Sequence, residues 1–452
     1  MDRHAVTEPP DTPRHRRLLG DSATAFSIKI ASAGLQLVMF VALAHAMKAA
    51  DYGTFGSAFS LVTLLAVLGS YGQRSLSLRF ASAYDEMGRP ELVRGILRDS
   101  YRLVLTGCAA CSVIVVADSL LNHQASALWI LGVSAMTVTT GLVEYQAIAF
   151  RAMASVWLTL LPRDIFHRAA ILLGATAAAV IGGRGAIGAL GWVWIFAGST
   201  LAAALVQLFL YERSQHRTIF SGSAEYAREE WRGPARGLWA TSVITTAVPS
   251  LSVVLIGHAL GPGPSGTFFS AMRIAQSLNI LLIATNVICT PLLSRALAVN
   301  DIERAQGVAS LTSLLGGAFG GAVYLILIFF GHPILGLFGT NFVSAYPSLL
   351  ILAFGFTFNT IAGPTGPLLE MSGNQGAYTA ILLIFNLLAL GAMPVAISLA
   401  GATGAASCVA FGAVGWNAAA WIYCRRRVGV DPTIFAALLN RRHHGPARAL
   451  PR

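Results

Sequence analysis

Charged residues are scarce in this sequence. Only 11% of its 452 residues are Asp, Glu, Lys or Arg, and 55% are hydrophobic. A soluble domain usually carries about 25% charged residues, because its surface has to meet water. A chain with so little charge cannot present such a surface, which excludes an ordinary soluble globular protein.

Cysteine is rare as well, and the motifs of common enzymes are missing. The one close cysteine pair, Cys108 and Cys111, lies in an apolar stretch, where we interpret both as small packing residues. The sequence has no Gly-rich phosphate loop, no His-Glu-x-x-His zinc motif and no Gly-x-Ser-x-Gly elbow. We therefore expect no enzymatic activity, no cofactor and no bound metal.

Long apolar blocks make up most of the chain. A helix needs about 20 residues to cross the ~30 Å of hydrocarbon in a bilayer, and lipid offers no partner for an open backbone hydrogen bond. We predict an all-α polytopic membrane protein with about twelve transmembrane helices. The spans are expected at 24–47, 53–72, 102–121, 126–148, 165–181, 189–211, 237–259, 266–290, 307–330, 347–368, 377–399 and 404–424.

The positions of the basic residues predict the orientation. With the N-terminus in the cytoplasm, 27 of the 31 Lys and Arg residues fall in cytoplasmic segments or, for Arg102 and Arg168, in the first turn of the span that follows, and only Lys48 and Arg184 fall in external loops. This bias predicts a multi-pass protein of the bacterial inner membrane, with a polar N-terminus (1–22) and a basic tail (425–452) both in the cytoplasm. The net charge of +11 is then explained by the attraction of these basic segments to the headgroups of the phospholipid bilayer. We therefore expect no nucleic acid as a partner.

An internal repeat divides the chain. Residues 45–58 (HAMKAADYGTFGSA) and 258–271 (HALGPGPSGTFFSA) match at seven of fourteen positions without a gap, at an offset of 213. The same offset relates the first span to the seventh. We predict two parallel six-helix repeats around a central cavity, an N-terminal half over 1–222 and a C-terminal half over 223–452. The polar linker between them predicts a short amphipathic surface helix over 223–232, with Trp231 toward lipid.

Ionisable residues inside a membrane are costly and mark candidate sites. Arg273 lies about two turns into the eighth span and can hold a phosphate through its guanidinium fork, unless it reaches back to the headgroups. The same alternatives apply to Lys29 in the first span. Glu144 near the end of the fourth span is a candidate for proton or cation coupling, and a structural ion pair with an arginine is the alternative.

Amide side chains extend the candidate site. Gln276, Asn279 and Asn286 share one face of the eighth span with Arg273, which favours the lining of a cavity over a hydrogen-bonded contact between helices. Asn359 opens an Asn-, Gly- and Pro-rich segment in the tenth span, which therefore cannot stay a regular helix. Irregular backbone at membrane depth is tolerated where it lines water or is buried in protein.

Three segments carry a family resemblance: LAHAMKAADYGTFGSAFSLVTLLAVLGSYGQRSLSLRFAS (43–83), EYQAIAFRAMASVWLTLLPRDIFHRAAILL (144–173) and GPTGPLLEMSGNQGAY (363–378). With these segments the chain resembles the multidrug/oligosaccharidyl-lipid/polysaccharide exporter superfamily, and within it the branch of O-antigen and exopolysaccharide flippases. The resemblance implies translocation of a polyprenyl-pyrophosphate-linked oligosaccharide by alternating access, in polysaccharide or lipopolysaccharide biosynthesis. Implied partners are that lipid-linked oligosaccharide, a polysaccharide polymerase and glycosyltransferases.

Two other functions stay open. An ion-coupled antiporter of drugs or small molecules belongs to the same superfamily, whose cation exporters commonly use an acidic residue in the first span. Here the first span has Lys29 and no carboxylate. A membrane glycan polymerase or transferase would be expected to show acidic residues in a sizeable external loop, and this chain has none of that kind.

Overall fold

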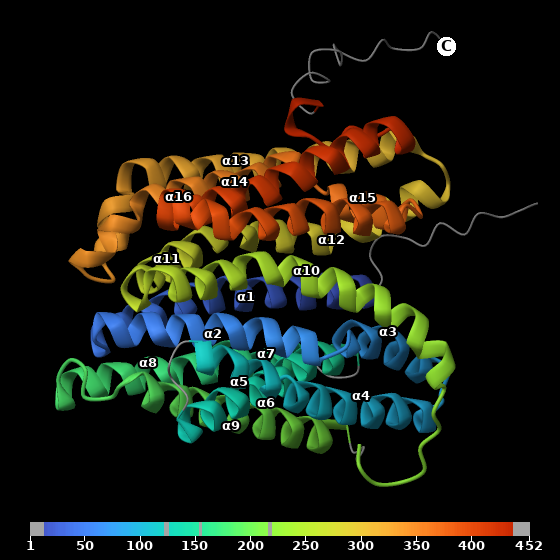
Figure 1. Ribbon diagram of the computed structural model, residues 1–452. Coiled ribbons are helices and arrows are strands. Elements are labelled where there is room, and N and C mark those ends of the chain that lie inside the picture. Colours follow the sequence, from blue (N-terminus) through green and yellow to red (C-terminus); the bar gives the residue numbers. More distant parts are fainter. Residues whose placement is uncertain (1–12, 122–125, 153–155, 216–218, 437–452) are drawn as a thin grey trace, which may run out of the picture.

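The computed structural model describes residues 13–121, 126–152, 156–215 and 219–436, and within these ranges the chain forms helices and no strand (Figure 1). The polar N-terminus and the basic tail are therefore described only in part. The α-helices are α1 (Pro13–Ala46), α2 (Ala49–Gly69), α3 (Gln73–Glu86), α4 (Pro90–Ala110), α5 (Ser112–Leu121), α6 (Ala127–Ala149), α7 (Val156–Leu161), α8 (His167–Ala177), α9 (Ala189–Gln215), α10 (Arg228–Leu260), α11 (Pro262–Gln276), α12 (Asn279–Ala298), α13 (Ile302–Gly336), α14 (Tyr346–Ala362), α15 (Thr365–Met371) and α16 (Gln375–Tyr423). Shorter turns are η1 (Phe150–Ala152), η2 (Pro162–Phe166), η3 (Ala178–Gly182), η4 (Thr340–Ala345) and η5 (Cys424–Val428).

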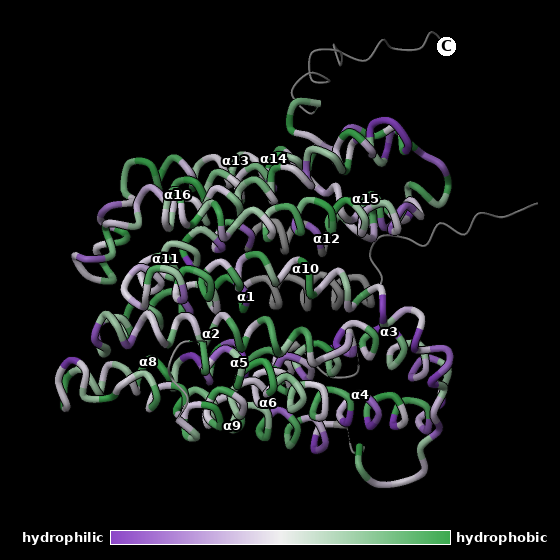
Figure 2. The backbone as a smooth tube through the Cα atoms, viewed as in Figure 1, coloured by the Kyte–Doolittle hydropathy of each residue, from purple (hydrophilic) through white to green (hydrophobic). Residues whose placement is uncertain are grey.

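The helices make twelve passes in the described part of the chain, as predicted. Ten helical segments are long and apolar enough to cross a membrane. The longest of them, Gln375–Val428, bends at Gly401, where φ is 58° and ψ is −137°, so it makes two passes. α11 and α12 together add the twelfth. Figure 2 shows hydrophobic residues along most of these helices.

The two ends of the bundle differ in charge. α3, α15 and residues 219–227 lie at one end, which we call the basic end and which the charge bias assigns to the cytoplasm (Figure 1). The turns that follow α1 and α10 lie at the other end, which we call the opposite end. Figure 2 shows hydrophilic residues along α3 and the start of α4 at the basic end.

Several spans differ from the prediction. The third and seventh were expected to begin at residues 102 and 237, but the helical segments begin at Pro90 and Arg228. The fifth span was expected at 165–181, but the helical segment is Trp157–Gly182, so it begins about two turns earlier. The eighth span was expected as one helix over 266–290, but it is broken at Ser277 and Leu278 between α11 and α12. The predicted polar stripe therefore does not run along a single helix. By contrast, α14 ends at Ala362 as the proline-rich segment of the tenth span predicts.

The predicted surface helix over 223–232 is wrong. α10 begins at Arg228 and continues unbroken to Leu260, so the start of the linker is extended and its end belongs to a spanning helix. Trp231 is only 3% exposed, and its Nε1 donates to the Tyr84 hydroxyl on α3 at 3.0 Å. The indole therefore packs inside the protein because α3 folds over it.

The two copies of the repeated motif face each other at the opposite end. A Cβ at Gly53 would lie 1.7 Å from the Pro262 carbonyl oxygen, and a Cβ at Gly266 would lie 3.0 Å from the Gly53 Cα. Both positions need glycine because α2 and α11 approach through their backbones. Hydroxyl pairs join the same surfaces, Tyr52 to Ser270 at 3.2 Å and Ser57 to Ser265 at 2.8 Å.

The linker binds along α4. The Arg98 Nε donates to the Ile219 carbonyl at 2.6 Å, and the Glu225 N–H donates to the Glu91 carbonyl at 3.0 Å. Residues 216–218 lie outside the described ranges. The boundary between halves at 222 and 223 remains our interpretation of the repeat.

Candidate functional site

A polar cavity of about 350 Å³ lies inside the bundle. It is bounded by α1, α2, α6, α8 and α9 of the predicted N-terminal half, and α3, η2, α10 and α11 contribute one residue each. The polar residues that line it are Gln36, Thr63, Arg74, Thr140, Glu144, Arg163, His167, Arg168, Thr200, Thr246 and Arg273. The first, second, seventh and eighth spans all contribute residues to the cavity, but most of its wall belongs to the predicted N-terminal half.

A wide helical turn in the fifth span brings charges into this cavity. η2 is a π-helical turn in which the His167 N–H reaches the Pro162 carbonyl. Such wide turns are rare and often occur at functional sites. Pro162 has no N–H to donate, and the turn places Arg163 and Asp164 in the interior, with the Asp164 side chain 1% exposed.

Asp164 is the centre of a cationic cluster. Its carboxylate forms an ion pair with the Lys29 ammonium of α1. It also lies 3.4 Å from the Arg163 Nη1 and 3.7 Å from the Arg168 Nη2. Arg168 in turn donates to the Ser32 carbonyl on α1 at 2.6 Å. One buried carboxylate therefore holds three cations from two spans together.

Glu144 lies in a second ion pair next to the first. Its carboxylate lies 3.2 Å from the Arg74 Nη1 at the start of α3 and forms an ion pair with Arg163. Arg163 thus connects Glu144 with Asp164. The predicted coupling residue is therefore fully engaged with arginines in this conformation, and its role in coupling remains a prediction.

Arg273 enters the cavity from the other half. Its guanidinium lies over the rings of Phe269, Phe59 and Phe40, with its Cζ 4.8, 5.1 and 5.9 Å from the ring centroids. Cation–π attraction of this kind holds a guanidinium in place in an apolar surround. Its Nη1 donates to Gln276 at 3.0 Å, while its buried Nε has no hydrogen-bond partner among the described residues. Arg273 therefore does not reach back to the headgroups but presents an unsatisfied donor in the interior.

The charges in and beside the cavity do not balance. Lys29, Arg74, Arg163, Arg168 and Arg273 supply five positive charges, whereas Glu144 and Asp164 supply two negative charges. Three positive charges are in excess within the described part of the site. Such an excess in a low-dielectric interior attracts an anion with several negative charges.

The predicted amides lie elsewhere. Asn359 donates to Asn279 at 3.3 Å, and Asn417 donates to Asn359 at 3.0 Å, so the three link α12, α14 and α16. Asn286 takes part in contacts within its own helix, where its carbonyl accepts from Thr290 at 2.6 Å. None of these asparagines lines the cavity of 350 Å³. Their predicted role in substrate binding therefore rests on the sequence pattern alone.

Sequence reasoning missed four of the charged residues. Arg74, Arg163 and Asp164 were assigned to cytoplasmic segments, because the second span was expected to end at residue 72 and the fifth to start at residue 165, and Arg168 was not singled out as a charge inside the fifth span. The apolar run VWLTLL (156–161) directly before Pro162 was the available signal, since it extends the span over the charged residues. With these residues placed in the interior, the cytoplasmic segments still hold far more Lys and Arg than the external loops.

No model of a known protein family matches the chain, and no curated protein matches it by sequence. Its fold matches solved structures of membrane transporters. An inward-facing multidrug resistance MATE family transporter of the MOP superfamily matches with a TM-score of 0.66 at 15% identity, over 90% of this chain and 98% of that chain. The lipid II flippase MurJ, in an inward closed conformation, matches with a TM-score of 0.63 at 14% identity, over 91% and 89%.

A third match is a MOP superfamily transporter from Pyrococcus furiosus, with a TM-score of 0.59 at 12% identity, over 90% of this chain and 95% of that chain. It is described as having a binding pocket of reverse polarity that suggests a different function. At such identities the likeness is one of fold. It confirms the expected all-helical membrane-protein fold, and the matched proteins are transporters and a flippase, not enzymes.

Proposed function

We propose that the chain is a flippase that translocates a polyprenyl-pyrophosphate-linked oligosaccharide across the bacterial inner membrane by alternating access. The observation that carries this proposal is the excess of three positive charges around the cavity. A pyrophosphate has the complementary charge, and arginine forks bind phosphate oxygens with two parallel hydrogen bonds. The matched lipid II flippase supports a lipid-linked substrate for this fold.

The ion pairs around the cavity stabilise its arginines. Glu144 and Asp164 each lie against more than one cation, and this offsets part of the repulsion between the arginines. A pyrophosphate would compete for the same guanidinium groups. We expect Arg273 to bind it from the C-terminal half, because its Nε has no partner among the described residues and the three phenylalanine rings hold its position.

The volume of the cavity limits the size of the ligand that it can hold in this conformation. Ligand sites for small molecules span about 300–1,000 Å³, and this cavity is near the lower end at about 350 Å³. It accommodates a phosphate-bearing headgroup but not a long glycan. We infer that the halves separate to admit the sugars, while the polyprenyl chain stays in lipid.

The biological setting follows from this substrate. Oligosaccharides of this kind are built by glycosyltransferases at the cytoplasmic face and joined by a polysaccharide polymerase at the external face, so both are proposed partners. O-antigen, exopolysaccharide or other lipopolysaccharide biosynthesis is the proposed pathway class.

An ion-coupled antiporter of drugs or small molecules is the second candidate. The fold of the multidrug resistance transporter favours it, and Glu144 would be the coupling residue. The charge of the cavity argues against a cationic drug, because five cations face two carboxylates. A glycan polymerase or transferase has no supporting observation in the described residues.

The test is translocation in proteoliposomes that contain the purified chain and a fluorescent polyprenyl-pyrophosphate-linked oligosaccharide. We expect the label to become accessible to an external quencher at a rate that Arg273→Ala lowers at least about 100-fold, since removing one preorganised donor to a phosphate costs about 3 kcal/mol. Arg295→Ala is the matched control, because Arg295 lies on the adjacent α12, is exposed and should leave the rate unchanged.

Two outcomes would decide against the flippase. Equal label accessibility in liposomes with and without protein would exclude this substrate. Gradient-driven efflux of a dye, without any movement of the lipid-linked glycan, would favour the antiporter instead.

A further inference from the structure

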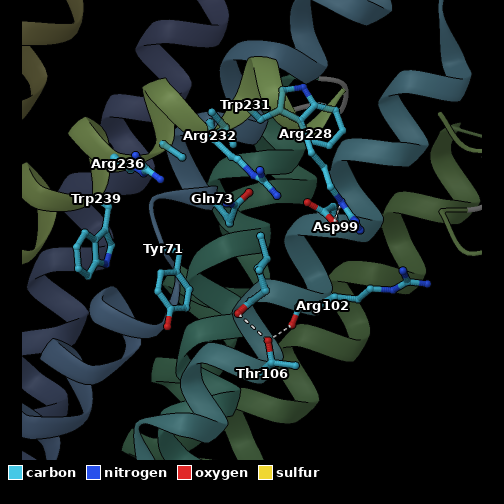
Figure 3. Close-up of a pocket in the computed structure, with 13 residues that line it drawn as sticks. Tyr71, Gln73, Asp99, Arg102, Thr106, Arg228, Trp231, Arg232, Arg236 and Trp239 are labelled. Carbon is cyan, nitrogen blue, oxygen red and sulfur yellow. Dashed lines mark hydrogen bonds and ion pairs between the residues drawn. The ribbon is translucent and has the colours of Figure 1, made fainter. Parts of the chain in front are cut away.

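A second polar site lies at the basic end, separate from the substrate cavity. It is a groove of about 560 Å³ between α4 of the N-terminal half and α10 of the C-terminal half (Figure 3). The corner between α2 and α3 forms its floor, with Tyr71, Gln73 and Leu76. No residue of the substrate cavity lines this groove.

Arginines dominate the groove. Arg228, Arg232 and Arg236 follow one another at intervals of four residues on α10, so they lie on one face of the helix. Arg102 lies on the α4 wall, and Asp99 is the one acidic residue among those that line the groove. Four cations thus share a groove with one carboxylate.

Only one of these arginines is neutralised. The Arg228 Nη2 lies 2.7 Å from the Asp99 carboxylate, as Figure 3 shows. The side chains of Arg102, Arg232 and Arg236 are exposed and have no ion-pair or hydrogen-bond partner among the described residues. Figure 3 shows Arg232 reaching into the groove above Gln73. Figure 3 also shows that Arg102 extends away from Arg232, so the three guanidinium groups do not meet at one point. Together they give the groove and its edges an excess of positive charge, which favours an anion.

Aromatic and apolar residues complete the groove on the side of the membrane. The rings of Tyr71 and Trp239 stack with centroids 6.0 Å apart at 26°, and the Trp239 Nε1 donates to the Leu68 carbonyl at 2.9 Å. Leu103 lies on the α4 wall next to Arg102. Tryptophan and tyrosine are typical of the level where headgroups meet hydrocarbon.

The sequence positions of these arginines also place the groove at the depth where headgroups meet hydrocarbon. Arg102 comes directly before the apolar part of the third span, and Arg236 directly before that of the seventh. Basic clusters at such positions attract the anionic lipids of the cytoplasmic leaflet. A soluble anion would explain the charges, but not the aromatic pair or the apolar wall that continues toward the hydrocarbon.

We propose that this groove binds the headgroup of an anionic phospholipid, with its phosphate at Arg232, the charges of Arg102 and Arg236 attracting it from the edges of the groove, and an acyl chain against Leu103 and Trp239. One wall belongs to each half, so the bound headgroup bridges the halves at the basic end. The lipid therefore stabilises the arrangement of α4 and α10 seen here over any arrangement in which they separate. This inference is independent of the transported substrate.

The test is thermal unfolding of the purified full-length protein in detergent, with phosphatidylglycerol, phosphatidylcholine or inorganic phosphate added. Phosphatidylglycerol is expected to raise the Tm of the wild type, and the other two are not. The triple variant Arg102→Gln, Arg232→Gln, Arg236→Gln should lose this rise and keep the wild-type Tm in phosphatidylcholine. Arg232→Gln alone should weaken the apparent affinity for phosphatidylglycerol about tenfold.

The control removes the same number of arginines from the same end. Arg425, Arg426 and Arg427 in η5 are exposed, and the triple glutamine variant at these positions should keep the full rise in Tm. The proposal is overturned if the groove variant keeps the rise or if the η5 variant loses it equally. It is also overturned if inorganic phosphate raises the Tm as phosphatidylglycerol does, because the site then binds a free anion.

Discussion

Asp164 shows how a single buried residue can determine a site. Its side chain is 1% exposed, and Lys29, Arg163 and Arg168 all lie within ion-pair distance of its carboxylate. Buried ion pairs add little net stability, but removing one partner leaves the other charge uncompensated and costs about 3–5 kcal/mol. The carboxylate therefore allows three cations to remain charged in the interior.

We predict that Asp164→Asn lowers the free energy of unfolding by about 3–5 kcal/mol, because the three cations lose their counter-charge. The loss should be smaller in the double variant Asp164→Asn, Lys29→Met, since one of the unpaired charges is removed as well. Thermal unfolding in detergent measures both. Glu225→Gln is the control, because its ion pair with Arg89 is more than half exposed on each side and should cost at most about 1 kcal/mol. A Tm for Asp164→Asn equal to that of Glu225→Gln would contradict the role of the cluster.

At the scale of elements, breaks and close approaches shape the function. The π-helical turn at Pro162 carries the charges, and the break after Gln276 separates Arg273 from the asparagines of α12. α2 and α11 contact each other through their backbones where the two repeats meet. This contact depends on Gly53, which has no side chain to hold the helices apart.

We predict that Gly53→Ala prevents closure at the opposite end. Its new methyl group would lie 1.7 Å from the Pro262 carbonyl oxygen, while alanine favours the helix itself by about 1 kcal/mol. The measurement is the yield of disulfide in a Ser57→Cys, Ser265→Cys background, which should fall severalfold. Gly198→Ala in α9 is the control, because a Cβ there meets nothing within 4 Å. An undiminished yield in Gly53→Ala would show that the helices have room for a side chain.

At the scale of the whole molecule, the two repeats close the opposite end almost symmetrically. His45 and His258 occupy equivalent positions of the repeated motif, and each contacts the other half. The His45 Nε2 lies 2.8 Å from the Leu337 carbonyl oxygen, and the His258 Nε2 lies 3.3 Å from the Asp118 carboxylate. In the proposed transport cycle, movement of a substrate to this side requires these contacts to break.

We predict that a disulfide in Ser57→Cys, Ser265→Cys stops transport, because it holds the halves together where the hydroxyl groups are 2.8 Å apart. Oxidation should reduce the rate in proteoliposomes to background, and a reductant should restore it. The control is Ser77→Cys, Ser100→Cys, whose hydroxyl groups are 2.9 Å apart within the N-terminal half. The five native cysteines are buried and free. Full activity after complete crosslinking would mean that this end does not open.

Much of the architecture was predictable. Hydropathy is a local property that adds along a helix, so the number of passes, the short loops and the break in the tenth span could be inferred residue by residue. The repeat could be found because both copies keep the small residues that a backbone contact needs, although the sequence did not show that Gly53 and Gly266 touch. Arg273 was recognisable because a lone charge in an apolar run is costly.

The sequence by itself therefore determined which parts of the chain enter the membrane and which end of the bundle is basic. Only the tertiary structure decided that Lys29 meets Asp164, 135 residues away, that Glu144 is held by two arginines, and that Trp231 is buried under α3. The reason is physical. The free energy of crossing a membrane depends on each segment alone, whereas the burial of a charge depends on counter-charges that distant segments bring to it.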